Sequence, residues 1–164
     1  MPSVVRHYLL PIYTCTDARC REPYLVAVVN RKRAMPDKLW RWTGALALFG
    51  GAAEPGEDTL AALRREMQEE LPVLALDGLG SLQTREVTGE LFTFTVTPLL
   101  CGAWTQEEYQ RLAASCAEGA VDWIAYRPSL CADGREEWTS VPWISGHMIT
   151  VVEEILAQHA GRVA

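Results

Sequence analysis

Four charged side chains lie close together between residues 50 and 73, namely Arg65, Glu66, Glu69 and Glu70. On a helix, at about 100° per residue, the three glutamates fall within an arc of roughly 100°. Carboxylates so close repel one another by roughly a few tenths of a kcal/mol per pair, a cost that a bound divalent cation reverses. Hard oxygen ligands favour magnesium or manganese. The segment therefore predicts a site for Mg²⁺ or Mn²⁺.

A helix must carry these carboxylates, and the apolar residues of the segment have helical spacing. They recur at intervals of three and four residues on one face, at Leu60, Leu63, Met67 and Leu71. Asp58 is a suitable N-cap. Pro72 ends the run, because the residue before a proline is disfavoured in the helical region and proline cannot continue the hydrogen-bond ladder. We expect a helix over about residues 58–71.

Strands are expected before this helix. Residues 4–13 and 24–30 are rich in β-branched and aromatic side chains, and a polar loop separates them. A further apolar run, residues 39–51, ends in the pair Gly50 and Gly51, as expected for a strand that enters a special turn. The two glycines would let this loop fold tightly against the helix.

The rest of the chain alternates strands and helices. Thr88, Gly89 and Glu90 suit a hairpin turn. Further strands are expected over residues 81–87, 90–100 and 120–126, and helices over residues 106–118 and 145–160. The sequence shows no internal repeat, low-complexity tract or linker. We therefore expect one domain over residues 1–164, with strands and helices in a single α+β or α/β layer structure.

Composition is that of a folded globular protein. Of the 164 residues, 49% are hydrophobic and 22% are charged, which argues against a disordered or fibrous chain. The net charge of -6 gives no basis for holding a phosphate backbone, so duplex nucleic acid is not an expected partner. No stretch is long enough to span a bilayer and no cleavable leader is evident, so we expect a cytoplasmic protein without a membrane partner.

The five cysteines form no C-x-x-C pair, so a zinc site is not expected. Cys15 and Cys20 could form a disulfide across a turn, but free thiols are the expectation in a reducing compartment. We assign the cysteines no role.

The charged segment resembles the Nudix box, G-x5-E-x7-R-E-U-x-E-E-x-G-U, in which U is aliphatic. The matching residues, in order, are Gly51, Glu57, Arg65, Glu66, Met67, Glu69, Glu70 and Val73. Pro72 replaces the second glycine of the pattern, so the helix exit cannot take the left-handed turn that a glycine allows. The strands around the box and the closing helix also follow the order of elements in Nudix proteins.

This resemblance implies an α/β/α sandwich with a central mixed β-sheet, and a hydrolase in which water attacks a phosphorus of a nucleoside diphosphate derivative. It implies that Glu66, Glu69 and Glu70 ligate the metal and that one of them can serve as the general base, a point on which the family varies. Metals must neutralise the diphosphate oxygens and lower the pKa of bound water. Glu57 would lie beside these ligands or bind metal through water, and Arg65 would orient a neighbouring carboxylate by a forked hydrogen bond.

One further acid lies outside the box. Glu118 resembles the additional acidic residue that many Nudix enzymes hold there, and would supply the base or a metal ligand. The alternative is a surface glutamate at a helix end. His7, His147 and Glu107 or Glu108 are interpreted as structural, because nothing local fixes them in a site.

Six tryptophans are many for this length, and a nucleotide base could stack on one of them. Most are expected in the core. Trp42 and Trp143 are the candidate substrate contacts, because alternating strand positions and helix entrances often line clefts.

Three functions are compatible with this resemblance. The leading one is a metal-dependent pyrophosphohydrolase acting on a nucleoside triphosphate, a nucleotide sugar or a dinucleoside polyphosphate. The second is a non-catalytic module of the Nudix fold that binds a nucleotide or has a regulatory role. The intact box glutamates count against this second function. The third, an isomerase of isoprenoid diphosphates, needs a catalytic Cys and Glu that we cannot assign. Because many proteins of this size form symmetric dimers, a homodimer is the expected assembly.

Overall fold

β1 (Val5–Cys15) runs through the middle of the sheet. The computed structural model describes residues 5–15, 25–32, 45–89, 92–115, 121–128 and 142–160. Within these residues, seven strands form one sheet. The other strands are β2 (Leu25–Lys32), β3 (Leu46–Ala47), β4 (Phe49–Ala52), β5 (Arg85–Thr88), β6 (Thr93–Trp104) and β7 (Val121–Pro128).

β1 has three neighbours in the sheet. Its first half pairs antiparallel with β4, its second half pairs antiparallel with β2, and nearly its whole length pairs parallel with β6. β5 pairs antiparallel with β6, while β3 and β7 pair antiparallel with β2. Parallel and antiparallel pairs therefore occur together, which confirms the expected mixed sheet.

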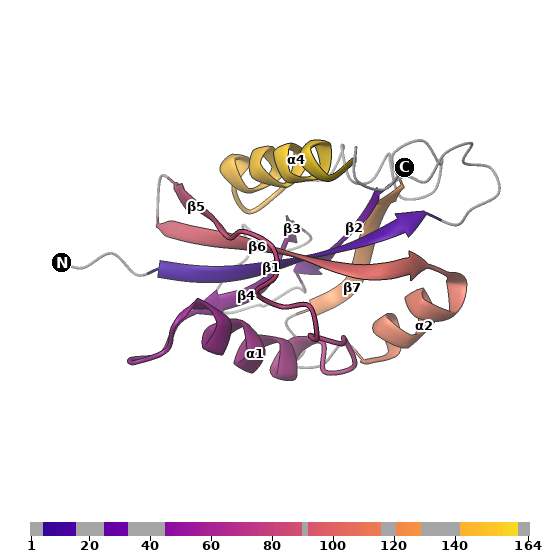
Figure 1. Ribbon diagram of the computed structural model, residues 1–164, viewed down its shortest axis with the longest axis horizontal. Coiled ribbons are helices and arrows are strands. Elements are labelled where there is room, and N and C mark those ends of the chain that lie inside the picture. Colours follow the sequence, from indigo (N-terminus) through magenta and orange to yellow (C-terminus); the bar gives the residue numbers. More distant parts are fainter. Residues whose placement is uncertain are drawn as a thin grey trace.

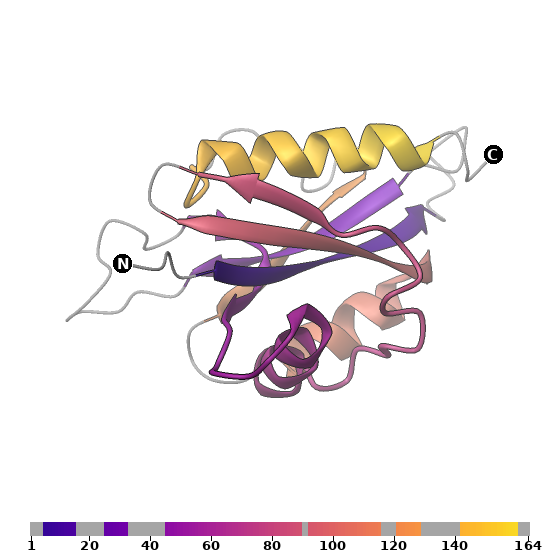
Figure 2. The same cartoon turned by 60° about the vertical axis from the view of Figure 1, so that its left-hand side comes forward.

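Helices cover both faces of this sheet. α1 (Thr59–Glu70) and α2 (Gln106–Ser115) lie on one face, and α4 (Gly146–Ala160) lies on the other (Figure 1). A view turned by 60° shows the same three layers (Figure 2). The α/β/α sandwich that the resemblance implied is confirmed.

Alternate side chains of β1 point to opposite faces of the sheet and so divide the apolar residues into two cores. Tyr8, Leu10 and Ile12 belong to the core under α4. Leu9 and Tyr13 belong to the core over α1. On this second side the buried residues of the box helix and its exit are Leu63, Met67 and Leu71. Their burial holds α1 on the sheet and leaves its other faces for charged side chains.

α1 begins and ends where the sequence predicts. Asp58 is the N-cap, and its carboxylate accepts a hydrogen bond from the amide of Ala61 at 2.8 Å. Leu71 is the C-cap, with φ -146° and ψ 65°, and its amide donates to the carbonyl of Met67. Pro72 follows at once and stops the ladder.

Two predicted strands differ from the structure. The strand expected over residues 81–87 begins only at Arg85, because the preceding residues form turns in which the amide and hydroxyl of Ser81 both donate to the carbonyl of Gly78. The expected run over residues 39–51, described from residue 45 onward, holds two short strands in place of one. Its first part pairs with β2 and its second part with β1.

The remaining predicted elements lie within a few residues of their expected places. The hairpin expected at residues 88–90 joins β5 to β6, with Thr88 paired to Thr93 and the amide of Gly89 donating to the carbonyl of Phe92. The part of the predicted helix beyond Ser115 lies outside the described residues.

Cys101 is a free, partly buried thiol in β6. Burial raises its pKa to about 12, so it stays protonated and unreactive at neutral pH. The side chains of the suggested Cys15–Cys20 pair lie outside those described. As for membrane spans, none of the described helices combines the required length with sufficient hydropathy.

Candidate active site

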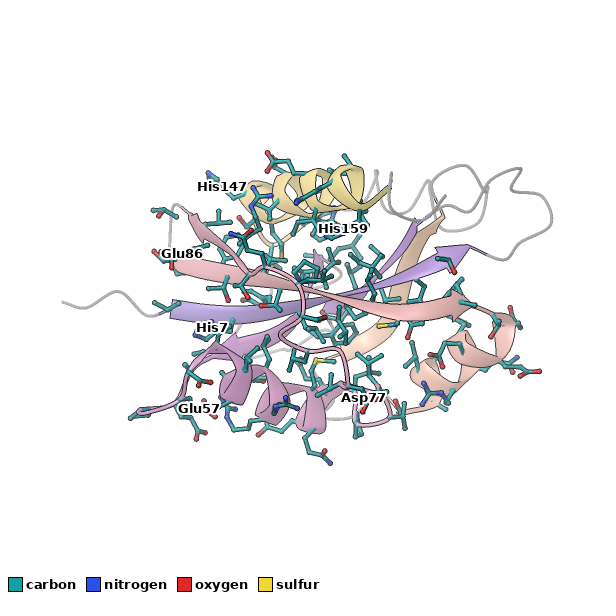
Figure 3. All side chains as sticks on the ribbon, in the orientation of Figure 1. His7, Glu57, Asp77, Glu86, His147 and His159 are labelled. Atoms are coloured by element: carbon teal, nitrogen blue, oxygen red, sulfur yellow. The ribbon has the colours of Figure 1, made fainter. Side chains whose placement is uncertain are left out.

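The box residues meet where α1 packs beside β4 at one end of the sheet. β4 carries Gly50 and Gly51, and α1 carries the arginine and three glutamates of the box. Figure 3 shows Glu57 at the start of α1 and His7 on the nearby part of β1. Residues 44 positions apart in the sequence are thus brought together by the pairing of β1 with β4, in which His7 is opposite Gly51.

Arg65 is the centre of the charged network. Its Nε donates to Glu57 Oε2 at 2.9 Å and its Nη2 donates to Glu57 Oε1 at 3.0 Å, which is the forked hydrogen bond that the resemblance implied. The same guanidinium donates through Nη1 to Glu66 Oε1 at 3.1 Å and through Nη2 to the carbonyl of Ala52 at 3.0 Å. Arg65 therefore ties the start of α1, the box carboxylate and β4 together.

These contacts set the charge states of Arg65 and Glu57. Hydrogen bonds from Arg65, and then the bond from the amide of Glu54, hold the pKa of Glu57 below its usual range. The hydrogen bond to Glu57 in turn raises the pKa of Arg65. Both groups are therefore ionised at neutral pH.

Glu66 lies directly against the backbone of the glycine loop. A Cβ placed on Gly51 would be 2.7 Å from Glu66 Oε1, closer than such contacts occur. The side chain of Glu66 is only 13% exposed. Glycine at position 51 therefore leaves the space that the carboxylate occupies, which is a more specific requirement than the tight loop expected from the sequence.

Gly51→Ala is expected to lower hydrolysis at least about tenfold, because the new methyl group displaces the Glu66 carboxylate from its place. The free energy of unfolding should change by less than about 1 kcal/mol, since the φ of Gly51 is ordinary and the displaced atoms end a flexible side chain. Gly78→Ala is the matched control, because its Cβ would make only ordinary contacts from 3.4 Å. Steady-state hydrolysis rates and urea unfolding are measured for both variants. A Gly51→Ala protein that hydrolyses at the wild-type rate would contradict the prediction.

The other two box glutamates have different surroundings. Glu69 is 41% exposed and lies 3.6 Å from Arg65 Nη1. Glu70 is buried, with 4% exposed, and its Oε2 accepts a hydrogen bond from the amide of Gly50 at 2.8 Å. The sequence placed all three carboxylates on one open face, whereas Glu70 in fact faces β4.

In their present conformation the carboxylates do not form a metal cage. Within the described part of the chain, no three His, Cys, Asp or Glu side chains stand in an arrangement that could hold a metal ion. Glu66 and Glu69 both contact Arg65, and Glu70 contacts Gly50. Metal binding would thus require these carboxylates to move closer to one another.

His7 lies beside the box, although its interpretation from the sequence is only structural. It is buried, and its Nδ1 is 2.8 Å from Thr95 Oγ1. Paired residues of an antiparallel ladder share a face. His7 is paired with Gly51, so it points to the face of the sheet on which Glu66 contacts Gly51. Burial lowers the pKa of His7, against the opposing charges of Glu57 and Asp58.

His7 should make the protein less stable in mild acid. Its folded-state pKa lies below the ordinary value of 6.5, so as pH falls through about 6.5 the unfolded chain binds a proton that the folded chain resists. The free energy of unfolding should therefore fall between about pH 7.5 and 5.5, and His7→Gln should flatten this slope. Urea titrations across that range test the prediction, and equal slopes in both proteins would refute it.

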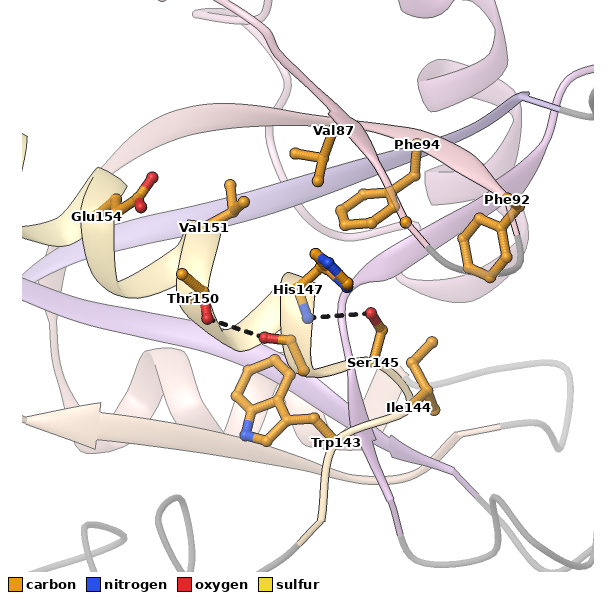
Figure 4. Close-up of a pocket in the computed structure, with 12 residues that line it drawn as sticks. Val87, Phe92, Phe94, Trp143, Ile144, Ser145, His147, Thr150, Val151 and Glu154 are labelled. Carbon is orange, nitrogen blue, oxygen red and sulfur yellow. Dashed lines mark hydrogen bonds between the residues drawn. The ribbon is translucent and has the colours of Figure 1, made fainter.

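A cavity of about 580 Å³ opens on the other face of the sheet, between the β5–β6 hairpin and the start of α4 (Figure 4). Aromatic and aliphatic side chains make most of its wall, including Phe92, Phe94 and Trp143. Polar groups at the helix end are supplied by His147, Thr150 and Glu154, among others. Trp143 thus lines a cavity, as the sequence suggested.

The cavity and the box lie at the same end of the sheet. One row of paired residues crosses the strands from Ala52 through Arg6 to Phe94. Ala52 accepts a hydrogen bond from Arg65, and Phe94 lines the cavity. The guanidinium of Arg6 lies 5.0 Å from the ring centroid of Phe92, which places a cation beside the cavity.

Four further residues were considered for the site in the sequence analysis. Trp42 and Glu118 lie outside the described residues. Glu107 is exposed in the first turn of α2. Glu108 accepts hydrogen bonds from Tyr13 and Arg111, which agrees with its structural interpretation.

A sequence model of the NUDIX domain matches residues 13–129, more than half of the chain. This chain belongs to the Nudix family. The expected enzyme class, a Nudix hydrolase acting on pyrophosphate bonds, is confirmed with it. No curated protein sequence matches the chain. A single Nudix domain over residues 1–164 stays a prediction.

Solved structures share the Nudix fold with this chain. An Ap4A hydrolase from C. elegans superposes with a TM-score of 0.63 at 11% identity, over 95% of this chain and 98% of the hydrolase. The NUDIX domain of Shewanella oneidensis NrtR, complexed with ADP ribose, gives 0.57 at 12%, over 97% and 88%. A bifunctional NMN adenylyltransferase/ADP ribose pyrophosphatase from Francisella tularensis, complexed with AMP and a Mn ion, gives 0.60 at 16%, over 94% of this chain but 42% of that protein.

Proposed function

We propose that this Nudix hydrolase is a divalent-metal-dependent pyrophosphohydrolase of nucleoside diphosphate derivatives, such as a nucleoside triphosphate, a nucleotide sugar or a dinucleoside polyphosphate. The arrangement around Arg65 carries the proposal. One arginine holds the ionised Glu57 by a fork and Glu66 by a further bond, with Glu66 seated on Gly51. So much fixed negative charge beside a glycine loop suits a cation and the phosphates that it neutralises.

Glu66, Glu69 and Glu70 would hold the metal. Their donor atoms are all carboxylate oxygens, which suit Mg²⁺ or Mn²⁺. The space above Gly51 that a Cβ would fill is taken by a carboxylate oxygen of Glu66, so the loop is shaped around this donor. When bound, the metal would neutralise the diphosphate oxygens and lower the pKa of water. The structure with AMP and a Mn ion supports a manganese alternative by analogy.

The chain's own residues would position water and move its proton. Water attacks one phosphorus of the diphosphate, the bridging P–O bond breaks, and the proton of water passes through a carboxylate to the leaving phosphate. A box glutamate or Glu118 would be this carboxylate. Arg65 keeps Glu66 oriented, and the amide of Gly50 holds Glu70.

We place the nucleoside or the second moiety in the cavity between the β5–β6 hairpin and α4. Its volume suits a small ligand, and Trp143 and Phe92 offer aromatic surfaces for a base. Its position at the same end of the sheet as the box supports a substrate that spans both. The Ap4A hydrolase and the ADP ribose complex of NrtR support nucleotides as the ligand class. Trp42 stays a candidate contact.

A panel of phosphoric anhydrides tests this function. Nucleoside triphosphates, ADP-ribose, nucleotide sugars and dinucleoside polyphosphates are incubated with the protein and Mg²⁺, and products are separated by chromatography. We expect turnover of at least one class. Trp143→Ala should raise KM for that compound at least about fivefold with little change in kcat, because it removes a binding surface away from the phosphates.

The opposite result would favour the binding module. Saturable binding of a nucleotide without turnover of any compound would overturn the hydrolase, and the ADP ribose complex of the NrtR domain makes ADP-ribose the first ligand to try. The cytoplasmic location and the homodimer remain predictions from the sequence.

A further inference from the structure

The exit of the box helix lacks the residue that normally shapes it. A glycine after the C-cap can turn left-handed, so that its amide and the next one satisfy the last carbonyls of the helix. Pro72 has no amide hydrogen and a fixed φ, so it can do neither. The amide of Leu71 makes the last helical bond, to the carbonyl of Met67, and the amide of Leu74 donates to the carbonyl of Leu71 at 3.1 Å. The hydrogen bonds of a glycine cap are therefore absent from this exit, and other contacts must supply them.

Arg111 of α2 contacts this exit. Its Nη1 donates to the carbonyl of Val73 at 2.7 Å, across 38 residues of sequence. Its Nε donates to Glu108 Oε1 at 2.7 Å, and its Nη2 lies 2.6 Å from the same oxygen. The guanidinium is thus held at one end by a carboxylate and presents its other end to the exit.

The arginine is in turn anchored in the core. Glu108 Oε2 accepts a hydrogen bond from the hydroxyl of Tyr13 at 3.0 Å. Tyr13 is buried in β1, and its ring packs against Trp104. Leu112, one residue after Arg111, is fully buried with Leu71 and Leu74 in the same apolar cluster. The contact therefore joins the box exit to the central strand through groups that are themselves fixed.

We propose that Arg111 is a positioning residue for the box helix: through the Val73 carbonyl it fixes an exit that has no glycine cap, and so holds Glu69 and Glu70 in place for the cation. Glu69 and Glu70 occupy the last turn of α1, four and three residues before Val73 respectively. Glu70 already depends on a 2.8 Å contact with Gly50 for its place. A displacement of the exit would act on both carboxylates directly, because only Leu71 and Pro72 separate the last turn of α1 from Val73. The effect of Arg111 on metal binding rests on the proposed function, whereas its effect on the helix exit does not.

A double-mutant cycle tests the proposal. Mn²⁺ affinity is measured by titration calorimetry for the wild type, Arg111→Ala, Pro72→Gly and the double variant. Arg111→Ala should weaken Mn²⁺ binding about fivefold. Pro72→Gly alone should be near neutral, and in its background Arg111→Ala should change affinity less than about twofold, because glycine supplies its own cap. Arg64→Ala, which removes an exposed positive charge from α1 itself, is the control and should not weaken binding.

A second readout needs no metal. Hydrogen exchange of the Leu71 and Leu74 amides, both hydrogen-bonded at the exit, should be faster in Arg111→Ala than in the wild type, and Arg111→Lys should restore part of the protection. An unchanged Mn²⁺ affinity in Arg111→Ala, or an equal loss with and without Pro72→Gly, would overturn the proposal. If the wild type binds no Mn²⁺, the proposed function fails instead, and the exchange rates alone decide whether Arg111 holds the exit.

Discussion

Glu69→Gln is expected to reduce hydrolysis at least about a hundredfold, because a metal-ligating carboxylate becomes a neutral amide. The fold should be unaffected. Glu69 is the most exposed of the box glutamates, and its carboxylate lies 3.6 Å from Arg65 Nη1. Glutamine keeps the size of the side chain, so the change removes charge and little else.

The measurement is the steady-state rate with Mg²⁺, together with thermal unfolding. Glu107→Gln, an exposed glutamate in the first turn of α2, controls for the loss of one surface charge and should keep full activity. A Glu69→Gln enzyme that turns over at a near-normal rate would remove Glu69 from the proposed metal site.

Gly50→Ala is expected to cost about 3 kcal/mol or more of the free energy of unfolding. A Cβ at this position would lie 2.0 Å from the carbonyl oxygen of His7, in backbone that cannot move aside, and Gly50 has a φ of 140° that other residues avoid. The variant should therefore unfold at much lower denaturant concentration or fail to accumulate.

Gly56→Ala separates the two causes of this loss. Its φ of 83° is also unfavourable for alanine, but apart from its chain neighbours no atom of the described residues lies within 4 Å of the new Cβ. It should cost only about 1 to 2 kcal/mol, the strain alone. If urea titrations give equal losses for the two variants, the close contact of Gly50 with β1 is not what makes glycine necessary there.

The local parts of the site could be predicted from the sequence. The extent of α1 and its Asp58 cap follow from the spacing of apolar residues and from Pro72, all within one short segment. The fork of Arg65 on Glu57 also joins two residues of the box, eight positions apart. The helix follows from this local spacing, whereas the fork was expected from the resemblance to the Nudix box.

The features that depend on strand pairing could not be predicted. The place of His7 beside the box follows from its pairing with Gly51, and the burial of Glu70 follows from its contact with Gly50. The late start of β5 has a different origin, because the turns before Arg85 are held by local hydrogen bonds from Ser81 to the carbonyl of Gly78. No local pattern indicates which strand lies opposite another.

The contact of Arg111 with Val73 also could not be predicted from the sequence. The substitution of Pro72 was visible in the sequence, and its effect on the helix exit could be stated, but the residue that acts on that exit lies on α2. Trp143, by contrast, was found from its position before a helix, and it does line a cavity. The position of a residue relative to a helix can be predicted from the local sequence. The residue that it contacts across the fold cannot.

The most direct test of the metal-dependent hydrolase is the cleavage of its best phosphoric anhydride in ¹⁸O-water under three successive conditions. The rate is measured with Mg²⁺, after removal of the cation by a chelator, and after Mg²⁺ is returned. We predict cleavage that stops on chelation and recovers on return, with one ¹⁸O atom in a phosphate of the product. Cleavage that persists at full rate without a divalent cation, or no cleavage of any compound with Mg²⁺ or Mn²⁺ present, would contradict the proposed function.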